Sequence, residues 1–549
     1  MNLSRIKRWI LLGHRWLGIG TCLLFFLWFL SGVVMMYVGH PKLTWQERLD
    51  HLPPLEASQP LLSPADAFRQ AGIHGTVTDL RLANARSGQP VYIAQIRPDP
   101  RPAPDAPRPE PRLLALDART GALLPPTDPA TALASAQVYL EQGGLSQPSS
   151  SSALPASGPR QPSTAPGAPG KPLYQGITVE DAHTHSKAMD LHRPLHKVLL
   201  PDADQTLLYI SGTTGEVVRD APQLERGFNY LGAWLHWLYL FRDTAIDWTD
   251  LIIWLSVIGT VATISGFLSG IIRWRFSRPY RSGSRSPFAP GALRWHHILG
   301  LVFALTTFTW IFSGLMSMNP WDIFEADESI IDARRISNPD IQPSRAIATP
   351  QALLASTTTP VRELQWHTLL DKARVKAIRT HEVPPGSNDQ PVLLSARTGK
   401  PYTLEPERLR SALFTLQAGY PPRIDILRQD DFYYYSRTEH TMTGGRKPHP
   451  LPIWRVRYDD PNQTWLHIDP ATGQVLNELD SYQRTERWLF ALLHSWDWLP
   501  LLQNRPLWDI VMLVLAAGGL ALSATGIWIA GHRLHIKTRR WRLLRRKPR

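Results

Sequence analysis

The sequence predicts an α-helical integral membrane protein, with four transmembrane helices in two parallel repeats and large α+β segments outside the membrane. Three observations lead to this fold class. Four apolar stretches are long enough to cross a bilayer, short motifs recur at constant spacing in the two halves of the chain, and the intervening segments alternate as β-hairpins do. The chain has 549 residues, enough for several domains.

The apolar stretches cover residues 16–39, 251–272, 298–319 and 510–531, and none of them contains Asp, Glu, Lys or Arg. Each exceeds the roughly 20 residues that a helix needs to cross the hydrocarbon core. The mean hydropathy of −0.20 does not argue against this, because long polar segments separate the stretches. The predicted order is helix 9–39, outer region 42–248, helix 249–273, loop 274–292, helix 293–319, outer region 322–507, helix 508–532 and a basic tail 533–549.

Two constant offsets relate the halves of the chain. His14, Gly18, Ser31 and Gly32 recur 282 positions later as His296, Gly300, Ser313 and Gly314. A second offset, of 258 positions, aligns residues 193–218 with 451–476 and carries His236 onto His494. Both halves have the same order of spans, so we expect an axis along the membrane normal to relate them.

The net charge of +13 is located at the ends of the apolar stretches. Residues 1–15, 273–294 and 532–549 hold 19 of the 59 Lys and Arg residues and no acidic residue. The positive-inside rule therefore predicts that both termini and the 274–292 loop are cytoplasmic and that both outer regions lie on the opposite side. No basic patch on a domain is predicted, which excludes a nucleic-acid partner.

Each outer region contains two alternating runs that end in a Thr-Gly turn, and this pattern predicts β-hairpins. The turn glycines, which are free to adopt positive φ, are Gly121, Gly215, Gly399 and Gly473. Helices are expected at 64–72 and 129–142, so the modules are predicted to be α+β. The Pro-rich segment 97–112 and the Ser/Pro/Ala-rich insert 147–171 bury too little apolar surface to order themselves.

The four histidines at the membrane are the main candidate site, because an ionisable group there is costly to leave unpaired. His14 and His296 lie at the cytoplasmic level of the first and third spans, and His236 and His494 lie near the outer surface. Two imidazoles that face each other within an apolar bundle are suited to the iron of a b-type haem. We expect one haem between each pair. His297, next to His296, is an alternative axial ligand.

Other residues complete the predicted haem sites. Gly18 and Gly300 lie one helical turn beyond the inner histidines, where the lack of a side chain lets a flat macrocycle approach the backbone. Arg15 and Arg294 could pair with haem propionates, although positive-inside anchoring explains them equally well. Cys22, the only cysteine, lies within the first span, so disulfides, iron–sulfur clusters and covalent c-type haem are all excluded.

A second group of histidines lies in the outer regions. Its spacing matches no fixed metal motif, and we interpret it as a hydrogen-bonded or solvated surface rather than a metal site. Its members are His183, His185, His192, His196, His440 and His449.

These motifs resemble the PepSY-associated transmembrane family, which includes bacterial inner-membrane ferrisiderophore reductases. The resemblance rests on residues 14–18, on Ser31-Gly32, on the His236 element before a span that ends at 273–275, and on the Thr-Gly hairpins. It implies PepSY-like periplasmic modules, haem b on the membrane histidines, and reduction of ferric chelates outside the cytoplasm.

The resulting functional prediction is a di-haem b ferric-chelate reductase of the inner membrane, which releases iron as Fe(II). No dinucleotide-binding motif follows a predicted strand, so a cytoplasmic reductase or membrane quinol is the expected electron donor. Two other functions remain open. The PepSY-like hairpins could bind or restrain a periplasmic partner without redox chemistry, or the chain could transport iron or a chelate, since parallel repeats also occur in carriers.

Overall fold

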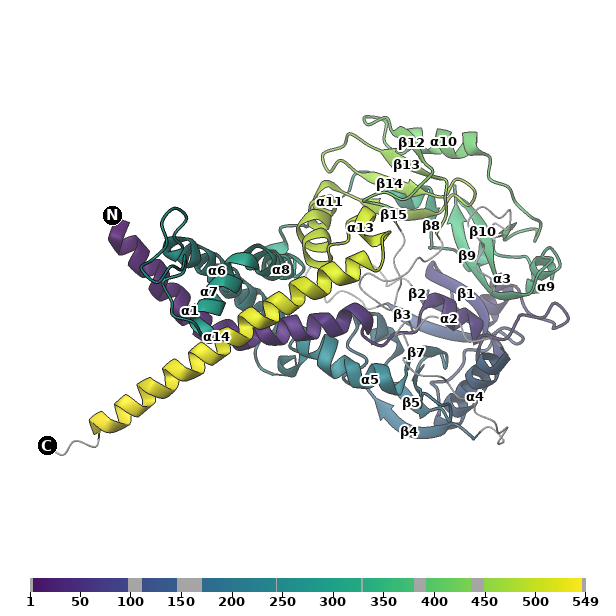
Figure 1. The fold of residues 1–549 in the computed structure, drawn as a ribbon. Helices are drawn as coiled ribbons and strands as arrows, with labels where there is room; N and C mark the ends of the chain where they lie inside the picture. Colours follow the sequence, from purple (N-terminus) through teal and green to yellow (C-terminus); the bar gives the residue numbers. More distant parts are fainter. Residues whose placement is uncertain are drawn as a thin grey trace.

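A computed structural model describes residues 3–96, 111–145, 170–242, 244–326, 329–379, 392–435 and 449–545. Figure 1 shows two parts: a bundle of long helices on one side and a group of β-sheets on the other. Both chain termini lie at the end of the bundle farthest from the sheets.

Three helices of the described chain are each long and apolar enough to span a membrane: α1 (Leu3–Tyr37), α6 (Trp248–Arg273) and α14 (Leu507–Arg545). The third predicted span is divided into α7 (Ala292–Val302) and α8 (Ala304–Met316), which are bent by 67° relative to each other. The prediction of four spans therefore holds only if this bent pair crosses the membrane as one unit. The length and apolar composition of these helices are those of a membrane protein.

The bend in the third span falls at Phe303, whose φ and ψ angles of −101° and 10° are not helical. Its carbonyl accepts a hydrogen bond from the Thr307 hydroxyl at 2.8 Å, a contact that promotes bending of helices. Its ring lies against Gly518 of α14, where an added Cβ would come within 2.2 Å of the ring. The ring of Phe29 on α1 occupies the matching space at Gly519. Glycines thus let these helices approach closely, as small residues do in membrane bundles.

The outer regions share one antiparallel sheet in the order β11-β10-β9-β1-β2-β3. Its strands are β1 (Val77–Arg86), β2 (Gln89–Ile96), β3 (Arg112–Asp117), β9 (Val361–Leu369), β10 (Lys372–Arg379) and β11 (Val392–Ser395), and the short β8 (Ser337–Asn338) pairs with β9. The central pairing of β1 with β9, in which Leu80 is opposite Trp366, joins segments that are far apart in the sequence. The core on one face includes residues of α3 (Pro64–Gln70) and α9 (Pro350–Leu354).

Two four-stranded antiparallel sheets have the same consecutive strand order. The first contains β4 (Leu173–Thr178), β5 (Leu195–Leu199), β6 (Leu207–Ser211) and β7 (Val217–Ala221), and packs on α4 (Pro129–Leu145). The second contains β12 (Arg423–Leu427), β13 (Ile453–Arg457), β14 (Trp465–Ile468) and β15 (Val475–Leu479), and packs on α10 (Pro406–Thr415).

Each four-stranded sheet leads into a helical segment that returns the chain to the membrane helices. After β7 come α5 (Gln223–Asn229) and the π-helical η2 (Tyr230–Trp234); after β15 come α11 (Ser481–Glu486), the π-helical η7 (Arg487–Leu492) and α12 (Leu493–Ser495). These segments position His236 and His494. The remaining short helices are α2 (Trp45–Asp50), η1 (Lys187–His192), η3 (Tyr239–Phe241), η4 (Pro320–Asp322), η5 (Ala333–Arg335), η6 (Pro343–Arg345) and α13 (Leu499–Leu502).

The predicted Thr-Gly turns are confirmed, because all four glycines have positive φ, between 70° and 78°. Two of the hairpins are complete, as β6–β7 and β14–β15, whereas the other two are reduced to the single bridges Leu116–Leu123 and Leu394–Pro401. The helices expected at 64–72 and 129–142 are α3 and α4. Most of the predicted flexible segments, 97–110 and 147–169, lie outside the described residues.

Candidate functional site

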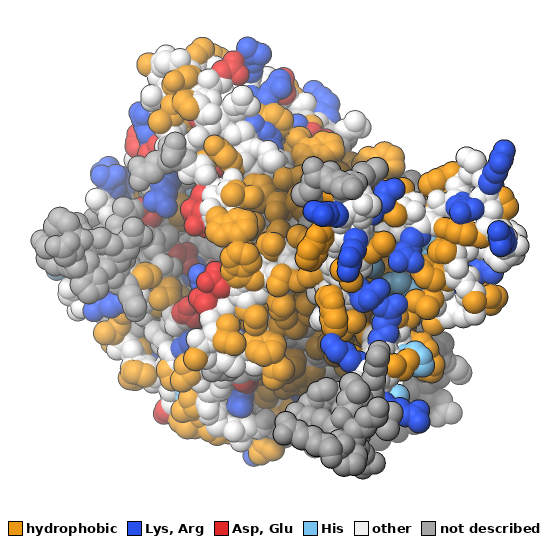
Figure 2. Space-filling model, turned by 90° about the vertical axis from the view of Figure 1, so that its left-hand side faces the viewer, with side chains coloured by type: hydrophobic (Ala, Val, Ile, Leu, Met, Phe, Trp, Pro, Cys, Tyr) orange, Lys and Arg blue, Asp and Glu red, His pale blue; other side chains and the backbone are white. Residues whose placement is uncertain are grey.

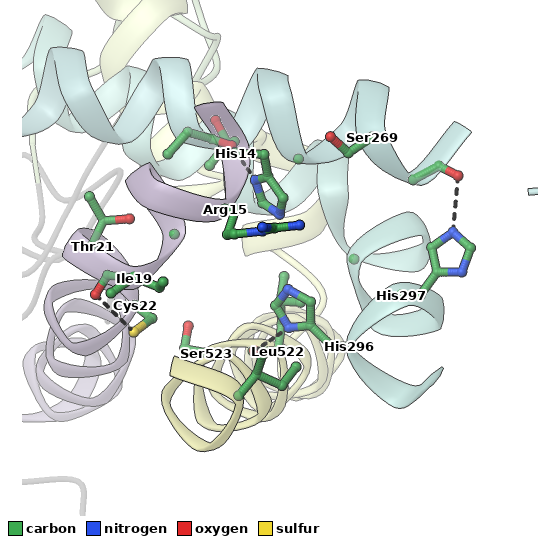
Figure 3. A pocket seen from close by; sticks show the side chains of 18 of the residues that line it. His14, Arg15, Ile19, Thr21, Cys22, Ser269, His296, His297, Leu522 and Ser523 are labelled. Atoms are coloured by element: carbon green, nitrogen blue, oxygen red, sulfur yellow. Dashed lines mark hydrogen bonds between the residues drawn. The ribbon is translucent and has the colours of Figure 1, made fainter. Parts of the chain in front are cut away.

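The bundle brings His14 of α1 and His296 of α7 together. Their ring centroids are 6.4 Å apart, and the ring planes differ by 24°. In Figure 3 the two rings point toward each other from opposite sides of a cavity. The sequence alignment of the halves predicted this juxtaposition.

The two inner histidines are held in the same way, each by a backbone carbonyl of another long membrane helix, α6 or α14. Nδ1 of His14 lies 3.4 Å from the carbonyl oxygen of Ala262 on α6. Nδ1 of His296 lies 3.3 Å from the carbonyl oxygen of Leu522 on α14 and 3.0 Å from the Thr525 hydroxyl. A carbonyl only accepts, so we assign the ring proton to Nδ1, which leaves the Nε2 lone pair of each ring directed into the cavity.

A glycine on α6 makes room for the inner ring of His14, because a Cβ at Gly266 would lie 2.8 Å from its Cε1. A Cβ at Gly526 of α14 would make an ordinary contact with Cε1 of His296, at 3.5 Å. Gly18 and Gly300, which the sequence analysis singled out, line the same cavity, but a Cβ there would make only ordinary contacts with protein atoms, at 3.9 and 3.6 Å. The closest packing against an inner ring is thus at Gly266, a position that the prediction did not include.

The cavity between the inner histidines has a volume of about 230 Å³, and the residues of its described lining include no acidic side chain. Arg15, Arg273 and Arg533, from three different helices, contribute to its wall. Arg294, the second predicted propionate partner, is not part of the lining. A third offset, of 260 positions, relates Gly266 of α6 to Gly526 of α14 and also Arg273 to Arg533. Extending the repeat alignment into these helices with that offset is the sequence signal that could have found the two arginines.

His297 has a different environment from its neighbour. Its Nδ1 lies 2.8 Å from the hydroxyl of Ser286, and its Nε2 lies 3.0 Å from the carbonyl oxygen of Gly270. Its ring points away from the paired histidines (Figure 3). Both ring nitrogens are therefore occupied within the protein, which favours His296 as the residue available for a ligand.

The second pair consists of His236 and His494, whose ring centroids are 6.1 Å apart with planes at 74°. Nδ1 of His236 is 2.9 Å from the Ser31 hydroxyl of α1, and Nδ1 of His494 is 3.0 Å from the Ser313 hydroxyl of α8. The two serines are equivalent in the repeat alignment. The repeated Ser-Gly pair thus has a role that the sequence alone did not indicate, because its serine contacts a histidine of the outer pair in each half.

The serine hydroxyls act as acceptors for the histidines. Ser31 donates its proton to the carbonyl of Leu27 at 2.7 Å, and Ser313 donates to the carbonyl of Trp310 at 3.1 Å. Because each hydroxyl proton is already used, the histidine Nδ1 must be the donor in the Ser–His contact. Nε2 of His236 and of His494 is thereby left as an acceptor, as at the inner pair.

The spacing of both pairs fits a shared iron. A metal ligated by two imidazoles at about 2.0 Å each holds their ring centroids roughly 6 Å apart. Ligating histidines in proteins also donate their other ring N–H to a carbonyl, a carboxylate or a similar acceptor. All four histidines meet both conditions. The residues of both sites therefore fit a bis-histidine haem.

The two pairs lie at opposite ends of the bundle. His14 and Ser31, which contacts the outer pair, are separated by 17 residues of α1, a distance of about 25 Å along a helix. The rings of Phe29 and Trp310, with centroids 5.5 Å apart, lie between these levels. Two redox centres at these positions would span most of the hydrocarbon core.

The histidines of the outer regions have hydrogen-bonding partners rather than a shared metal site. His183 contacts Asn229, His185 contacts Glu180, His192 contacts Ser211, His196 contacts Tyr174 and His449 contacts Asp430. Within the residues that the structure describes, no group of three or more His, Cys, Asp or Glu side chains could hold a metal ion. His440 lies outside those residues.

The family model that matches this chain is that of the PepSY-associated TM region, and the match covers residues 11–387. This range includes α1 from residue 11 onward, α6 and the bent pair α7–α8, and thus His14, His236 and His296. No curated protein matches the sequence significantly.

Proposed function

The chain belongs to the family of the PepSY-associated TM region, and from this premise we propose that it is a haem b oxidoreductase that passes electrons across the membrane to ferric-siderophore complexes. The observation that carries the proposal is the pairing of four membrane histidines at centroid distances of 6.4 and 6.1 Å, each anchored through Nδ1. Two haems b, one per pair, are the cofactors that these residues would hold.

When bound, each haem would supply one-electron chemistry through its iron. The protein residues have separate tasks. The carbonyls of Ala262 and Leu522 and the hydroxyls of Ser31 and Ser313 orient the imidazoles and fix their tautomer. The apolar walls of the bundle exclude water, and the burial they provide tunes the reduction potential.

We assign the cavity arginines to the propionate groups of the inner haem. Arg15, Arg273 and Arg533 bring three positive charges to a wall whose described lining contains no acidic residue. A guanidinium group binds a carboxylate through two parallel hydrogen bonds. This assignment retains Arg15 from the sequence analysis and replaces Arg294 by Arg273 and Arg533.

The direction of electron transfer follows from a proposed orientation. Both termini lie at the end of the bundle away from the sheets, and the helices carry basic residues there. Figure 2 shows Lys and Arg side chains among hydrophobic ones at that end. By the positive-inside rule we place the termini in the cytoplasm of a bacterial cell and the sheets in the periplasm. The two halves would then be parallel repeats in the inner membrane, and a cytoplasmic reductase or membrane quinol would supply the electrons.

The reaction at the outer surface is a one-electron reduction. Iron(III) in the chelate gains one electron to become iron(II), and no covalent bond to the protein is formed. Hard oxygen ligands hold the harder ferric ion more tightly than the ferrous ion, so reduction weakens the complex. Release of Fe(II) follows from that difference.

Absorption spectra of the detergent-purified protein, before and after dithionite, test the haem assignment. We expect low-spin b-type bands from two components. His14→Ala and His296→Ala should lose one component, and His236→Ala and His494→Ala the other. His297→Ala, one residue from a proposed ligand, is the matched control and should retain both. A colourless protein from haem-replete cells would refute the proposal.

A further inference from the structure

The segment between α6 and α7, residues 274–292, is a folded surface, which we call the arginine loop. The backbone N–H of Arg275 donates to the carbonyl of Arg285 at 3.1 Å, and the N–H of Tyr280 donates to the carbonyl of Ser284 at 2.8 Å. These bonds draw the two sides of the loop together. A partner would therefore meet a preformed surface.

We propose that the arginine loop is the docking site of the electron donor and that this donor is a soluble one-electron carrier protein with an acidic surface. The inference rests on the proposed function for the electron transfer, but docking can be tested by binding alone. It selects one of the two donors considered above, the cytoplasmic protein, over the membrane quinol.

The charge of the arginine loop is positive and uncompensated. Residues 273–294 contain six arginines and no acidic residue. Arg278 and Arg281 are exposed and form no hydrogen bond or ion pair with another described residue, and the guanidinium of Arg285 donates only to two backbone carbonyls of the loop. An acidic protein surface is attracted to such a patch, and this attraction raises the rate of encounter.

The positive-inside rule accounts for the sign of these charges but not for their arrangement, because it requires only that basic residues lie near the ends of the spans. The Tyr280 hydroxyl donates to the carbonyl of Arg273, at the end of α6, at 2.9 Å. The Arg275 guanidinium lies over the Tyr280 ring, 4.1 Å from its centroid. These contacts hold the loop against Arg273, which lines the cavity between the inner histidines.

An aromatic cluster connects the arginine loop to the inner histidine pair. The ring centroids of Phe288 and Trp274 lie 5.5 and 5.8 Å from that of His297, both edge-on. Ser286, which is 1% exposed, lies 2.8 Å from Nδ1 of the same histidine. Phe288 also lines the inner cavity, and His297 is adjacent in the chain to the proposed ligand His296. A carrier on the loop would be separated from the inner site by this packed cluster.

The inner cavity offers a quinol no group to accept its protons. Oxidation of a quinol releases two protons with two electrons, and a base within hydrogen-bonding reach must take them up. The described lining contains no carboxylate, His14 and His296 direct their free nitrogens at the proposed iron, and both nitrogens of His297 are bonded. An iron–sulfur carrier needs no base: it loses one electron, the inner site gains one, and no bond forms or breaks.

A plant-type [2Fe–2S] ferredoxin is the probe, because it is a small acidic protein that carries one electron. Its oxidised form cannot reduce the inner site, so its binding to the full-length protein reports docking alone. Biolayer interferometry at low ionic strength measures this binding, whether or not the protein contains haem. With the reduced form, stopped-flow absorption follows the reduction of haem.

We expect Arg278→Gln combined with Arg281→Gln to weaken binding of the oxidised ferredoxin roughly tenfold and to slow reduction by the reduced form by a similar factor. Arg397→Gln combined with Lys400→Gln is the matched control. It also removes two exposed cations three positions apart, but in the second outer region, and should change neither quantity. All four side chains are exposed, so the melting temperature should be unaltered.

Equal affinity of the wild type and the Arg278/Arg281 variant overturns the assignment to this loop. A wild-type protein that contains haem but does not bind ferredoxin also overturns it, and the proposed function survives both results. Faster reduction by decylubiquinol than by ferredoxin overturns the choice of donor. A protein without haem that shows the expected binding pattern supports the docking site and refutes the redox function.

Anionic lipid headgroups are the other chemistry that a basic loop beside the membrane attracts. Binding of ferredoxin is therefore compared in nanodiscs of phosphatidylcholine alone and in nanodiscs that also contain phosphatidylglycerol. We expect binding in both. Loss of binding in the phosphatidylglycerol nanodiscs alone would assign the loop to lipid and overturn the proposal.

Discussion

The two histidine pairs depend on small neighbours whose roles differ between the inner and outer sites. At the outer site, serine hydroxyls from α1 and α8 accept the Nδ1 protons of His236 and His494. At the inner site, backbone carbonyls have this function, and Gly266 provides the space for the His14 ring. Each arrangement fixes one tautomer, so single substitutions should have effects specific to one site.

Replacing Ser313 by Ala should alter only the outer haem. Without the Ser313 hydroxyl, His494 keeps only its contact with the Trp310 backbone, so its imidazole becomes a weaker electron donor to iron and the potential of one component should rise by tens of millivolts. Ser317→Ala is the matched control, because the Ser317 hydroxyl donates only to Gly314 of its own helix, at 2.7 Å. Potentiometric titration measures the haem potentials of both variants. Identical potentials in Ser313→Ala and wild type would contradict the role assigned to this serine.

A methyl group at Gly266 should disrupt the inner site, because a Cβ 2.8 Å from Cε1 of His14 must displace the ring. We expect Gly266→Ala to lose one low-spin component in the reduced spectrum. Gly20→Ala, on α1, should retain both, since outside the local backbone of α1 no described atom lies within 4 Å of its added Cβ. Retention of two components in Gly266→Ala would show that the ring does not need this space.

At the scale of elements, buried ion pairs connect the sheets of the outer regions. Arg81 of β1 bonds Glu216, in the turn between β6 and β7, at 2.7 Å, and it lies 3.6 Å from Glu363 of β9. Glu363 in turn bonds Arg48 of α2 at 2.7 Å. The side chain of Glu216 is 4% exposed and that of Glu363 is fully buried. This network joins the first four-stranded sheet to the pairing of β1 with β9.

The network predicts a loss of stability in acid. Burial by itself raises the pKa of Glu216, but the Arg81 charge outweighs this and lowers the pKa from 4.5 to about 2. A carboxylate with a lowered pKa stabilises the fold fully above its unfolded pKa, and this contribution is lost as the pH falls from about 4.5 toward 2. The melting temperature should therefore fall in this window, and Glu216→Gln should reduce the dependence on pH.

The same variant should lower stability at neutral pH by about 3–5 kcal/mol, because it leaves the buried Arg81 without its main partner. Asp459→Asn is the control. Its ion pair with Arg423 is exposed, with side chains 74% and 72% accessible, so the change should be within about 1 kcal/mol. Equal melting temperatures for Glu216→Gln and Asp459→Asn at pH 7 would contradict a structural role for the network.

At the scale of the whole molecule, the sheets lie at one end of the helical bundle and the chain termini at the other. The proposed direction of electron flow depends on which side of the membrane each of these two ends faces. The lone Cys22 makes single-cysteine labelling practicable, because Cys22→Ser provides a cysteine-free background. Ser282→Cys in the 274–292 loop and Thr358→Cys in the second outer region are both at exposed positions.

In cells with a permeable outer membrane, an impermeant maleimide should label Thr358→Cys and not Ser282→Cys. Ser282→Cys should react only after the inner membrane is disrupted, since the positive-inside rule places this loop in the cytoplasm. The reverse pattern would invert the proposed direction of transfer while leaving the histidine pairs unaffected.

The sequence by itself determined the repeated local features. The Thr-Gly turns have the predicted positive φ because glycine tolerates that conformation locally. Constant offsets placed His14 with His296 and His236 with His494, since equivalent positions on similar elements meet across a shared axis. The structure brings these residues together, and ligation of haem remains a prediction.

The tertiary structure decided two kinds of feature: the direction in which a side chain points, and the contacts between residues far apart in the sequence. His296 and His297 are adjacent, but they project about 100° apart around the helix, and packing against α14 and against Gly270 decides which faces the cavity. The bend at Phe303 and the pairing of β1 with β9 depend on partners more than 200 residues away. Local sequence does not contain those partners, because packing and strand pairing are set by the surfaces that meet in the fold.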